Sequence, residues 1–180
     1  MATHEVPQPA PDRMVEAAGH PMVMGIVPGQ PDLVTRTAEA WARAVGASAL
    51  YCAYVDGSRF VAEEHPDGTV RHAPIDPDGM DDDWQEHERH IIDHLSTVLV
   101  DSPVPWVFRY LAGRPDRALT HLARAVDASG FVIGTRAPHA GSRVRDVLEG
   151  SVAFRLTHHQ HRPVLVVPLE VVDWKAALWR

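Results

Sequence analysis

The sequence predicts an α/β protein in which helices cover both faces of a five-stranded parallel sheet. Short β-branched runs bounded by Gly and Pro, such as residues 131–133 and 164–167, are typical of strands that are buried on both faces. Segments of helical periodicity separate these runs, so that strand and helix alternate four times along the chain. This alternation indicates a parallel sheet between two helical layers, which is a three-layer sandwich.

Length and composition are those of one globular domain. The chain has 180 residues, of which 45% are hydrophobic and 23% are charged, which is enough to bury a sizeable core. We expect a mobile N-terminal tail over residues 1–19, a folded domain over residues 20–169 and a C-terminal extension over residues 170–180. The net charge of −7 argues against a general surface for nucleic acid or anionic membranes. No apolar run is long enough to span a bilayer.

The single cysteine, Cys52, lies in an apolar run and has no partner for an internal disulfide. The N-terminal residues show neither the basic nor the apolar region of a secretory signal. These two features predict a reduced, cytoplasmic protein.

The first half of the chain supplies two strands and a helix. Residues 22–27 are the first strand, and residues 49–55, a nearly unbroken apolar run, are a central strand. The helix between them follows the turn at residues 28–32 and ends at Gly46. Its apolar stripe is predicted to consist of Val34, Ala38, Trp41 and Val45.

Residues 56–83 are too long for an ordinary connection between a strand and a helix. Two short alternating segments flank Asp67-Gly68, a dipeptide typical of hairpin turns. We therefore predict a β-hairpin over residues 59–75, outside the main sheet. The alternative is a disordered loop.

Two more helices precede the last βαβ unit. Acidic residues 81–83 begin the first of them, which runs to about residue 100. Residues 103–110 are the third strand, and their prolines favour the start of a strand or the edge of a sheet. Pro115 begins the next helix and Gly130 ends it.

The βαβ unit over residues 129–168 contains groups suited to binding an anion. Gly134 supplies a turn at the end of the first strand, and Gly141 lies where the following helix begins. Glycines let backbone N–H groups approach a phosphate, and a helix N-terminus favours negative charge. Arg136 adds a side chain that pairs with phosphate oxygens, and Gly150-Ser151 allows a close approach from within the helix.

The motifs Gly134-Thr135-Arg136 and Gly150-Ser151-Val152, with the strand that ends at Pro168, resemble the universal stress protein family. The similarity extends from about residue 22 to residue 168. It implies the strand order 3-2-1-4-5 and the binding of ATP through a G-x2-G-x9-G-[ST] motif, with nucleotide-bound Mg²⁺ as the only metal expected. In that order the switch point lies between the first and fourth strands, where ligands of open α/β sheets bind.

The resemblance also implies which positions of this chain belong to a nucleotide site. They follow the first, second and fourth strands or lie in the anion loop and its helix. The implied binding residues are Val27, Pro28, Val55, Gly134, Thr135, Arg136, Gly141, Gly150, Ser151 and Val152.

Two departures from the family pattern leave the function open. Ala137 replaces the second glycine of the motif, so the loop is three residues longer and Gly141 is the displaced turn. Val27-Pro28 stands where the family has an aspartate that helps to hold the nucleoside. The candidates are a stress-response regulator or sensor that binds an adenine nucleotide, a nucleotide-free homodimeric scaffold, and a weak ATPase.

No catalytic motif accompanies the predicted site. The chain has neither a G-x-S-x-G elbow nor a GxxxxGK[ST] loop, so no catalytic residue is assigned and slow ATP hydrolysis is the most that we expect. Histidines gather at residues 87–94 and 158–161 without a carboxylate or cysteine at a recognisable metal spacing. We interpret His87 and His94 as partly buried, hydrogen-bonded side chains and predict no metal there.

Residues 164–167 contain no charged side chain and lie at the end of the sheet in the resembling topology. An exposed strand of this kind favours pairing with another chain, and a two-fold antiparallel pairing would bury both edges at once. Members of the family dimerise in this way. The resemblance and the edge argument together predict a homodimer through Val164–Val167.

Overall fold

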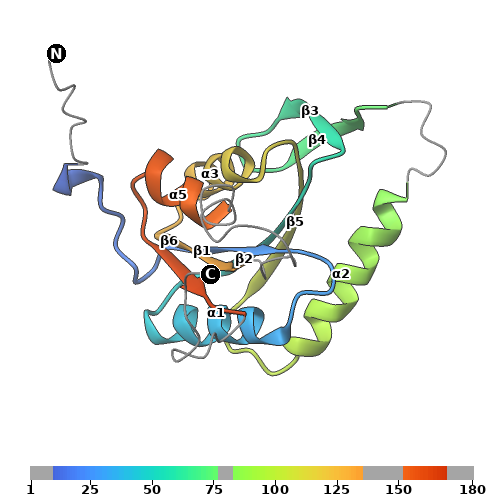
Figure 1. Cartoon of the computed structure of the whole chain (residues 1–180). Helices are drawn as coiled ribbons and strands as arrows, with labels where there is room; N and C mark the ends of the chain where they lie inside the picture. The colour runs from blue at the N-terminus through green and yellow to red at the C-terminus, as the bar shows by residue number, and fades with distance from the viewer. Residues whose placement is uncertain (1–9, 77–82, 136–151, 170–180) are drawn as a thin grey trace, which may run out of the picture.

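The computed structural model describes residues 10–76, 83–135 and 152–169. Within these ranges, five parallel strands form one sheet with the order β5-β2-β1-β6-β7 (Figure 1). The strands are β1 (Met22–Ile26), β2 (Leu50–Asp56), β5 (Trp106–Ala112), β6 (Gly130–Gly134) and β7 (Val164–Val167). Numbered among themselves, they have the predicted order 3-2-1-4-5. The predictions for residues 1–9, 77–82, 136–151 and 170–180 lie outside the described residues.

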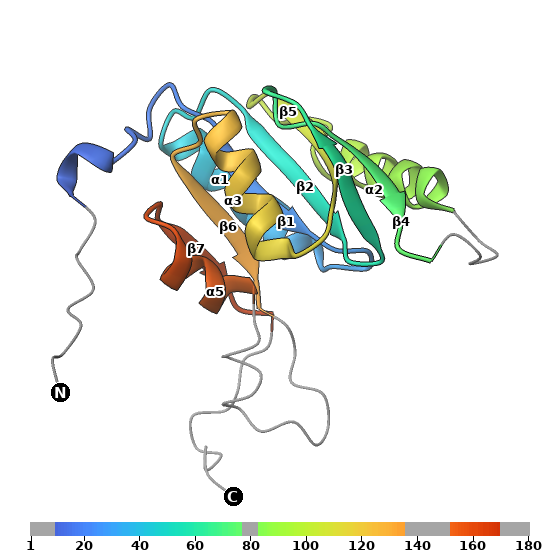
Figure 2. The same cartoon turned by 90° about the horizontal axis from the view of Figure 1, so that it is seen from above.

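Helices cover both faces of this sheet, which confirms the predicted sandwich. The helices α1 (Asp32–Ala44) and α2 (Trp84–Val98) lie on one face, whereas α3 (Pro115–Ala125) and α5 (Val152–His159) lie on the other (Figures 1 and 2). A short 3-10 helix, η1 (Pro11–Arg13), precedes β1. No helix within the described ranges is both long and apolar enough to cross a membrane.

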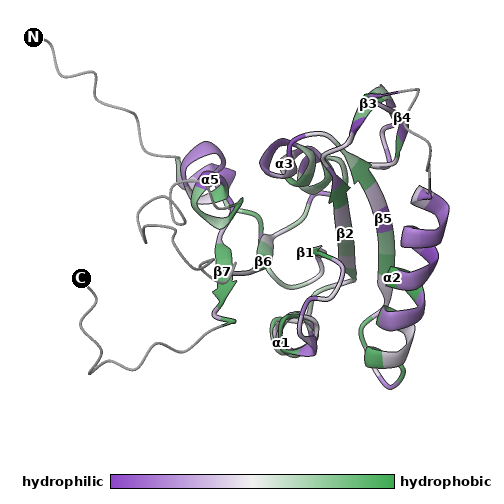
Figure 3. Ribbon diagram, turned by 45° about the vertical axis from the view of Figure 1, so that its right-hand side comes forward, coloured by the Kyte–Doolittle hydropathy of each residue, from purple (hydrophilic) through white to green (hydrophobic). Residues whose placement is uncertain are grey.

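The central strand β1 is buried from both sides. Met24 packs into the apolar cluster under α1 and α2, and Val23 packs into the cluster under α3 and α5. Both side chains are fully buried, which explains why the strand is a continuous apolar run rather than an alternating one. Polar residues lie on the outward surfaces, as the coloured ribbon of α2 shows (Figure 3).

The buried face of α1 differs from the prediction at one position. Val34 and Ala38 are fully buried as expected, but Trp41 is 48% exposed and Ala42 is buried in its place. Small side chains at positions 38 and 42 let the helix approach the sheet closely, and the large indole remains outside. The prediction of Trp41 as a core residue is therefore wrong.

The edge strand β5 begins later than predicted. Pro103 and Pro105 have no N–H to donate, and the strand starts after them at Trp106. The carbonyl of Pro105 still accepts a hydrogen bond from the backbone N–H of Leu50 (2.8 Å). As the prolines indicated, β5 lies at the edge of the sheet.

The predicted hairpin is present. β3 (Arg59–Glu64) and β4 (Val70–Pro74) pair antiparallel and form a separate two-stranded sheet. Gly68 adopts a positive φ of 80° at the turn, and an added Cβ would lie 2.6 Å from Leu122 Cδ1 of α3. The turn therefore needs glycine both for its backbone conformation and for its close packing against α3.

A cluster of aromatic and charged side chains joins the hairpin to the main sheet. The buried Arg59 donates from Nε to His72 Nδ1 (2.7 Å) and lies over the ring of Trp84, 5.7 Å from its centroid. The hydroxyl of Tyr110 in β5 donates to Oδ2 of Asp56 at the end of β2 (2.7 Å). The rings of His72, Trp84 and Tyr110 are in mutual contact, so β2, β4, β5 and α2 meet in one place.

Removing the Tyr110 hydroxyl should destabilise the protein and change its response to acid. Burial alone would raise the pKa of Asp56, but hydrogen bonds from Ser58 and Tyr110 and the charge of Arg59 outweigh it and lower this pKa. We expect Tyr110→Phe to reduce the free energy of unfolding by about 1–2 kcal/mol in urea denaturation, because a hydrogen bond to a charged group is lost.

The acid response follows from the direction of the shift. The stabilisation from Asp56 is fully present above its unfolded pKa of about 3.9, and it is lost as the pH falls through the lower folded value. Tyr110→Phe should therefore lose less stability over this range than the wild type. Tyr51→Phe is the control, since its hydroxyl makes no hydrogen bond within the described ranges. Equal stability of the Tyr110 variant and the wild type would contradict the prediction.

Candidate functional site

The candidate site lies at the carboxyl ends of β1 and β6. These neighbouring strands pair in parallel from Met22 opposite Gly130 to Gly25 opposite Ile133, so both end at the same edge of the sheet. The chain leaves β1 toward β2 and leaves β6 toward β7, on opposite sides. A crevice opens at such a switch point because the two following connections diverge.

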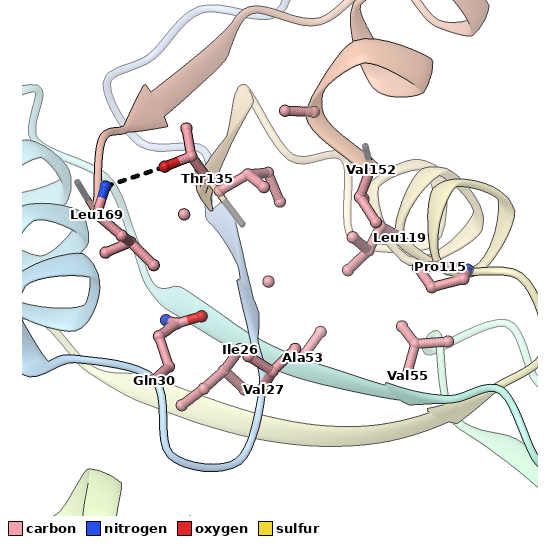
Figure 4. A pocket seen from close by; sticks show the side chains of 14 residues that line it. Ile26, Val27, Gln30, Ala53, Val55, Pro115, Leu119, Thr135, Val152 and Leu169 are labelled. Carbon is pink, nitrogen blue, oxygen red and sulfur yellow. Dashed lines mark hydrogen bonds between the residues drawn. The ribbon is translucent and has the colours of Figure 1, made fainter. Parts of the chain in front are cut away.

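A cleft of about 130 Å³ occupies this position. Its walls come from the ends of β1, β2 and β6, from the starts of α3 and α5, and from Leu169, which follows β7 (Figure 4). Most of the described lining is apolar, including Ile26, Val55, Leu119, Ile133 and Leu169. The cleft is smaller than the about 300–1,000 Å³ usual for small-molecule sites, so it can enclose only part of a ligand such as a nucleotide.

Two glycines permit the close packing around the cleft. A Cβ on Gly25 would lie 2.8 Å from Ile133 Cδ1, and a Cβ on Gly134 would lie 2.9 Å from Val34 Cγ2. A larger residue at either position would displace these neighbours. Gly134 therefore has a packing role at the wall of the cleft, beside the turn that the sequence predicts for it.

Thr135 and Gln30 provide the polar side chains of the described lining. Thr135 Oγ1 accepts a hydrogen bond from the backbone N–H of Leu169 (2.9 Å), drawn as a dashed line in Figure 4. Its own hydroxyl hydrogen is then able to point to a ligand. The Nε2 atom of Gln30 is buried and has no hydrogen-bond partner among the described residues. An unsatisfied buried donor costs about 1–3 kcal/mol, so this atom requires an explanation.

The buried carboxylate of Asp116, next to the cleft, is neutralised by an ion pair. Asp116 follows the lining residue Pro115 and is 6% exposed. Arg114 donates to it from Nε (3.1 Å) and Nη2 (2.6 Å). These hydrogen bonds lower the pKa of Asp116, so the group is an ion pair whose opposite charges compensate each other.

Half of the predicted site residues meet at this cleft. Val27, Val55, Gly134, Thr135 and Val152 all line it. Pro28 lines a neighbouring groove instead, and Arg136, Gly141, Gly150 and Ser151 lie outside the described residues.

Sequence reasoning missed several lining residues, chiefly Gln30, Leu119 and Leu169. Leu119 lies within the helix that Pro115 begins, and Leu169 lies just beyond the last strand. The signal for Gln30 was its position three residues after Val27, on the loop that leaves the first strand.

The neighbouring groove contains the histidines of α2. His87, His90 and His94 line it together with Pro28 and Gly29. All three are exposed, so the interpretation of His87 and His94 as partly buried is wrong. His94 Nε2 lies 3.3 Å from a carboxylate oxygen of Asp32. Within the described ranges, no group of three or more His, Cys, Asp and Glu side chains is placed to hold a metal ion.

The parallel sheet, its helical layers and the cleft at the switch point define an α/β domain of the open-sheet class, a class in which ligands bind at this position. The model of the universal stress protein family matches residues 58–168. This range is more than half of the chain, which therefore belongs to the universal stress protein family. No curated protein matches the sequence.

Solved structures of the family share this fold. A universal stress protein from Archaeoglobus fulgidus is 18% identical with a TM-score of 0.57, over 83% of this chain and 93% of that chain. A universal stress protein in complex with cAMP is 20% identical with a TM-score of 0.56, over 84% and 98%. The universal stress protein from Archaeoglobus fulgidus in complex with dAMP is 18% identical with a TM-score of 0.55, over 82% and 96%.

The hydrogen bond between Thr135 and Leu169 should stabilise one wall of the cleft. Thr135→Val keeps the shape but removes the acceptor of the Leu169 N–H, and we expect the free energy of unfolding to fall by about 1–2 kcal/mol. Thr135→Ser keeps the acceptor and is the matched control, with most of the stability retained. Urea denaturation gives the free energies, and amide exchange at Leu169 should accelerate only in the valine variant. No difference between the two variants would refute this role of the hydroxyl.

Proposed function

We propose that this protein binds an adenine nucleotide, with ATP as the leading candidate, in the cleft between β1 and β6, and acts as a stress-response regulator or sensor. The observation that carries the proposal is the apolar cleft at the switch point, which also contains two hydrogen-bonding side chains. An uncharged, mostly apolar wall suits a flat aromatic base. It does not suit a phosphate, which needs charged or N–H donors.

The comparisons support the adenine nucleotide as the ligand class. Two of the similar structures are universal stress proteins in complex with cAMP and with dAMP, and both ligands contain adenine. In the present chain the base would enter the cleft. The phosphates, with any accompanying Mg²⁺, would bind to the segment after Thr135, where the sequence predicts the anion loop.

The proposal does not require catalysis. Neither Gln30 nor Thr135 is a general base at neutral pH, and Asp116 is paired with Arg114. Cys52 is buried, and burial raises its pKa to about 12, so its thiol is not an available nucleophile. We retain the cytoplasm as the expected location and slow ATP hydrolysis as the upper limit of activity.

Binding of ATP should raise the thermal stability of the protein. At a concentration 100-fold above the dissociation constant, a ligand that binds only the folded state adds about 2.7 kcal/mol. We expect a melting shift with millimolar ATP, measured with and without Mg²⁺. Val27 is 49% exposed at the rim of the cleft, so Val27→Trp should cover the cleft and abolish the shift without preventing folding.

Val100→Trp is the matched control, because Val100 is 75% exposed and does not line the cleft. A wild type that shows no shift in either condition would support the nucleotide-free scaffold instead. Turnover of ATP that Val27→Trp abolishes would support the weak ATPase.

We also propose a homodimer that forms through β7. This strand is at the edge of the sheet that the described strands form, and Val166 is 39% exposed there. The four residues of β7 carry no charge that would block pairing with a second copy. Antiparallel pairing across a two-fold axis would satisfy the backbone groups of both edges.

A charge in β7 should separate the dimer. Light scattering of the wild type at tens of micromolar should give about twice the chain mass of 19.9 kDa. Val166→Lys should give the monomer, since pairing would bury an unpaired ammonium group. Val100→Lys places the same charge on an exposed residue elsewhere and should remain a dimer. A monomeric wild type, or a folded Val166→Lys dimer, would contradict the proposed interface.

A further inference from the structure

Gln30 is held at the cleft by a tight turn. The backbone N–H of Gln30 donates to the carbonyl of Val27 (3.1 Å), and Gly29 between them has a φ of 70°. Proline followed by a glycine of positive φ is the pattern of a type II turn. The residues that stand in place of the family's aspartate, Val27 and Pro28, therefore begin the turn that presents Gln30.

The side chain of Gln30 is aimed at the cleft. Figure 4 shows its carboxamide turned toward the space between β1 and the Thr135–Leu169 wall. The Nε2 atom is buried without a partner in the described part of the chain. The last torsion of a glutamine side chain is broad and roughly two-fold, so the amide can direct its nitrogen or its oxygen to a ligand. The carboxamide carries an N–H donor and a carbonyl acceptor side by side.

A donor and an acceptor side by side, as in the Gln30 carboxamide, distinguish one nucleotide base from another. Adenine presents the amino group N6, a donor, next to the ring nitrogen N7, an acceptor, and glutamine pairs with both atoms at once. A base with an oxygen at position 6 presents two acceptors on the same edge. Glutamine satisfies only one of them, and its own oxygen then faces the other acceptor. A carboxylate at position 30 would offer only acceptors.

We propose that Gln30 is a specificity-determining residue that pairs with N6 and N7 of adenine. This inference rests on the proposed binding of a nucleotide in the cleft. The apolar walls contact the faces of the base, and the Gln30 carboxamide reads its edge. The chain thereby distinguishes adenine by a neutral side chain, presented by the turn that begins at Val27 and Pro28.

Isothermal titration with ATP and ITP tests the proposal, because ITP carries an oxygen in place of N6 and is otherwise the same size. A good bidentate pair is worth a factor on the order of ten to one hundred in discrimination. We expect the wild type to bind ATP more tightly than ITP by such a factor. Gln30→Leu should weaken ATP binding and leave ITP binding nearly unchanged, so that the preference is lost.

Two further variants at position 30 test the proposal without relying on Gln30→Leu alone. Gln30→Glu should weaken the binding of both nucleotides but keep the preference for ATP, because a carboxylate still accepts from N6 and can donate neither to N7 nor to an oxygen at position 6. Gln30→Arg should shift the preference toward ITP, since two donors match two acceptors. Gln85→Leu, at an exposed position on α2 outside the cleft, is the control and should behave as the wild type does. Circular dichroism confirms that each variant is folded.

The outcomes separate this inference from the proposed function. A wild type that binds ATP and ITP equally, or a Gln30→Leu variant that weakens both ligands by the same factor, overturns the pairing with adenine and leaves nucleotide binding intact. No binding of either ligand by the wild type overturns the proposed function, and this inference with it. Loss of the preference in Gln30→Leu and its reversal in Gln30→Arg, with Gln85→Leu unchanged, support the pairing with adenine.

Discussion

The burial of β1 on both faces is the constraint on which the rest of the structure depends. Val23 and Met24 alternate along this strand, yet neither is exposed, because helices cover each side of the sheet. The backbone N–H and C=O groups of a strand enclosed in this way can form hydrogen bonds only with the two neighbouring strands. Its flanking strands β2 and β6 are thereby held in parallel register, and their ends meet at one edge of the sheet.

The cleft follows from that arrangement. β1 and β6 end at the same edge of the sheet, and the chain continues from them to opposite sides. The first residues of α3 and α5 that line the cleft there are small or apolar. Because most of the lining is apolar, a polar group without a partner is costly in the space that remains. Gln30 and Thr135 are therefore the two described lining residues whose side chains could orient a ligand through hydrogen bonds.

The hairpin adds a second connection between the sheet edge and the α3 layer. Gly68 packs against α3, and the cluster around Arg59 and Tyr110 holds the base of the hairpin to β5 and α2. The insertion thus contacts β5, the strand at the far end of the described sheet from β7, through His72 and Tyr110. The edge at β7 is the one proposed to pair with a second copy.

The amino-acid sequence by itself determined the succession of strands and helices along the chain and the hairpin, because apolar periodicity and the positions of Gly and Pro are local properties of the chain. Its glycine motifs indicated the family, and only that resemblance gave the order of the strands in the sheet. It also indicated five residues that meet at the cleft, among them Val27 and Thr135. Only the tertiary structure decided that Trp41 is exposed, that Pro28 faces the α2 histidines, and that Gln30 has a buried amide. Each of these depends on how closely one element approaches another, which no periodicity in the sequence records.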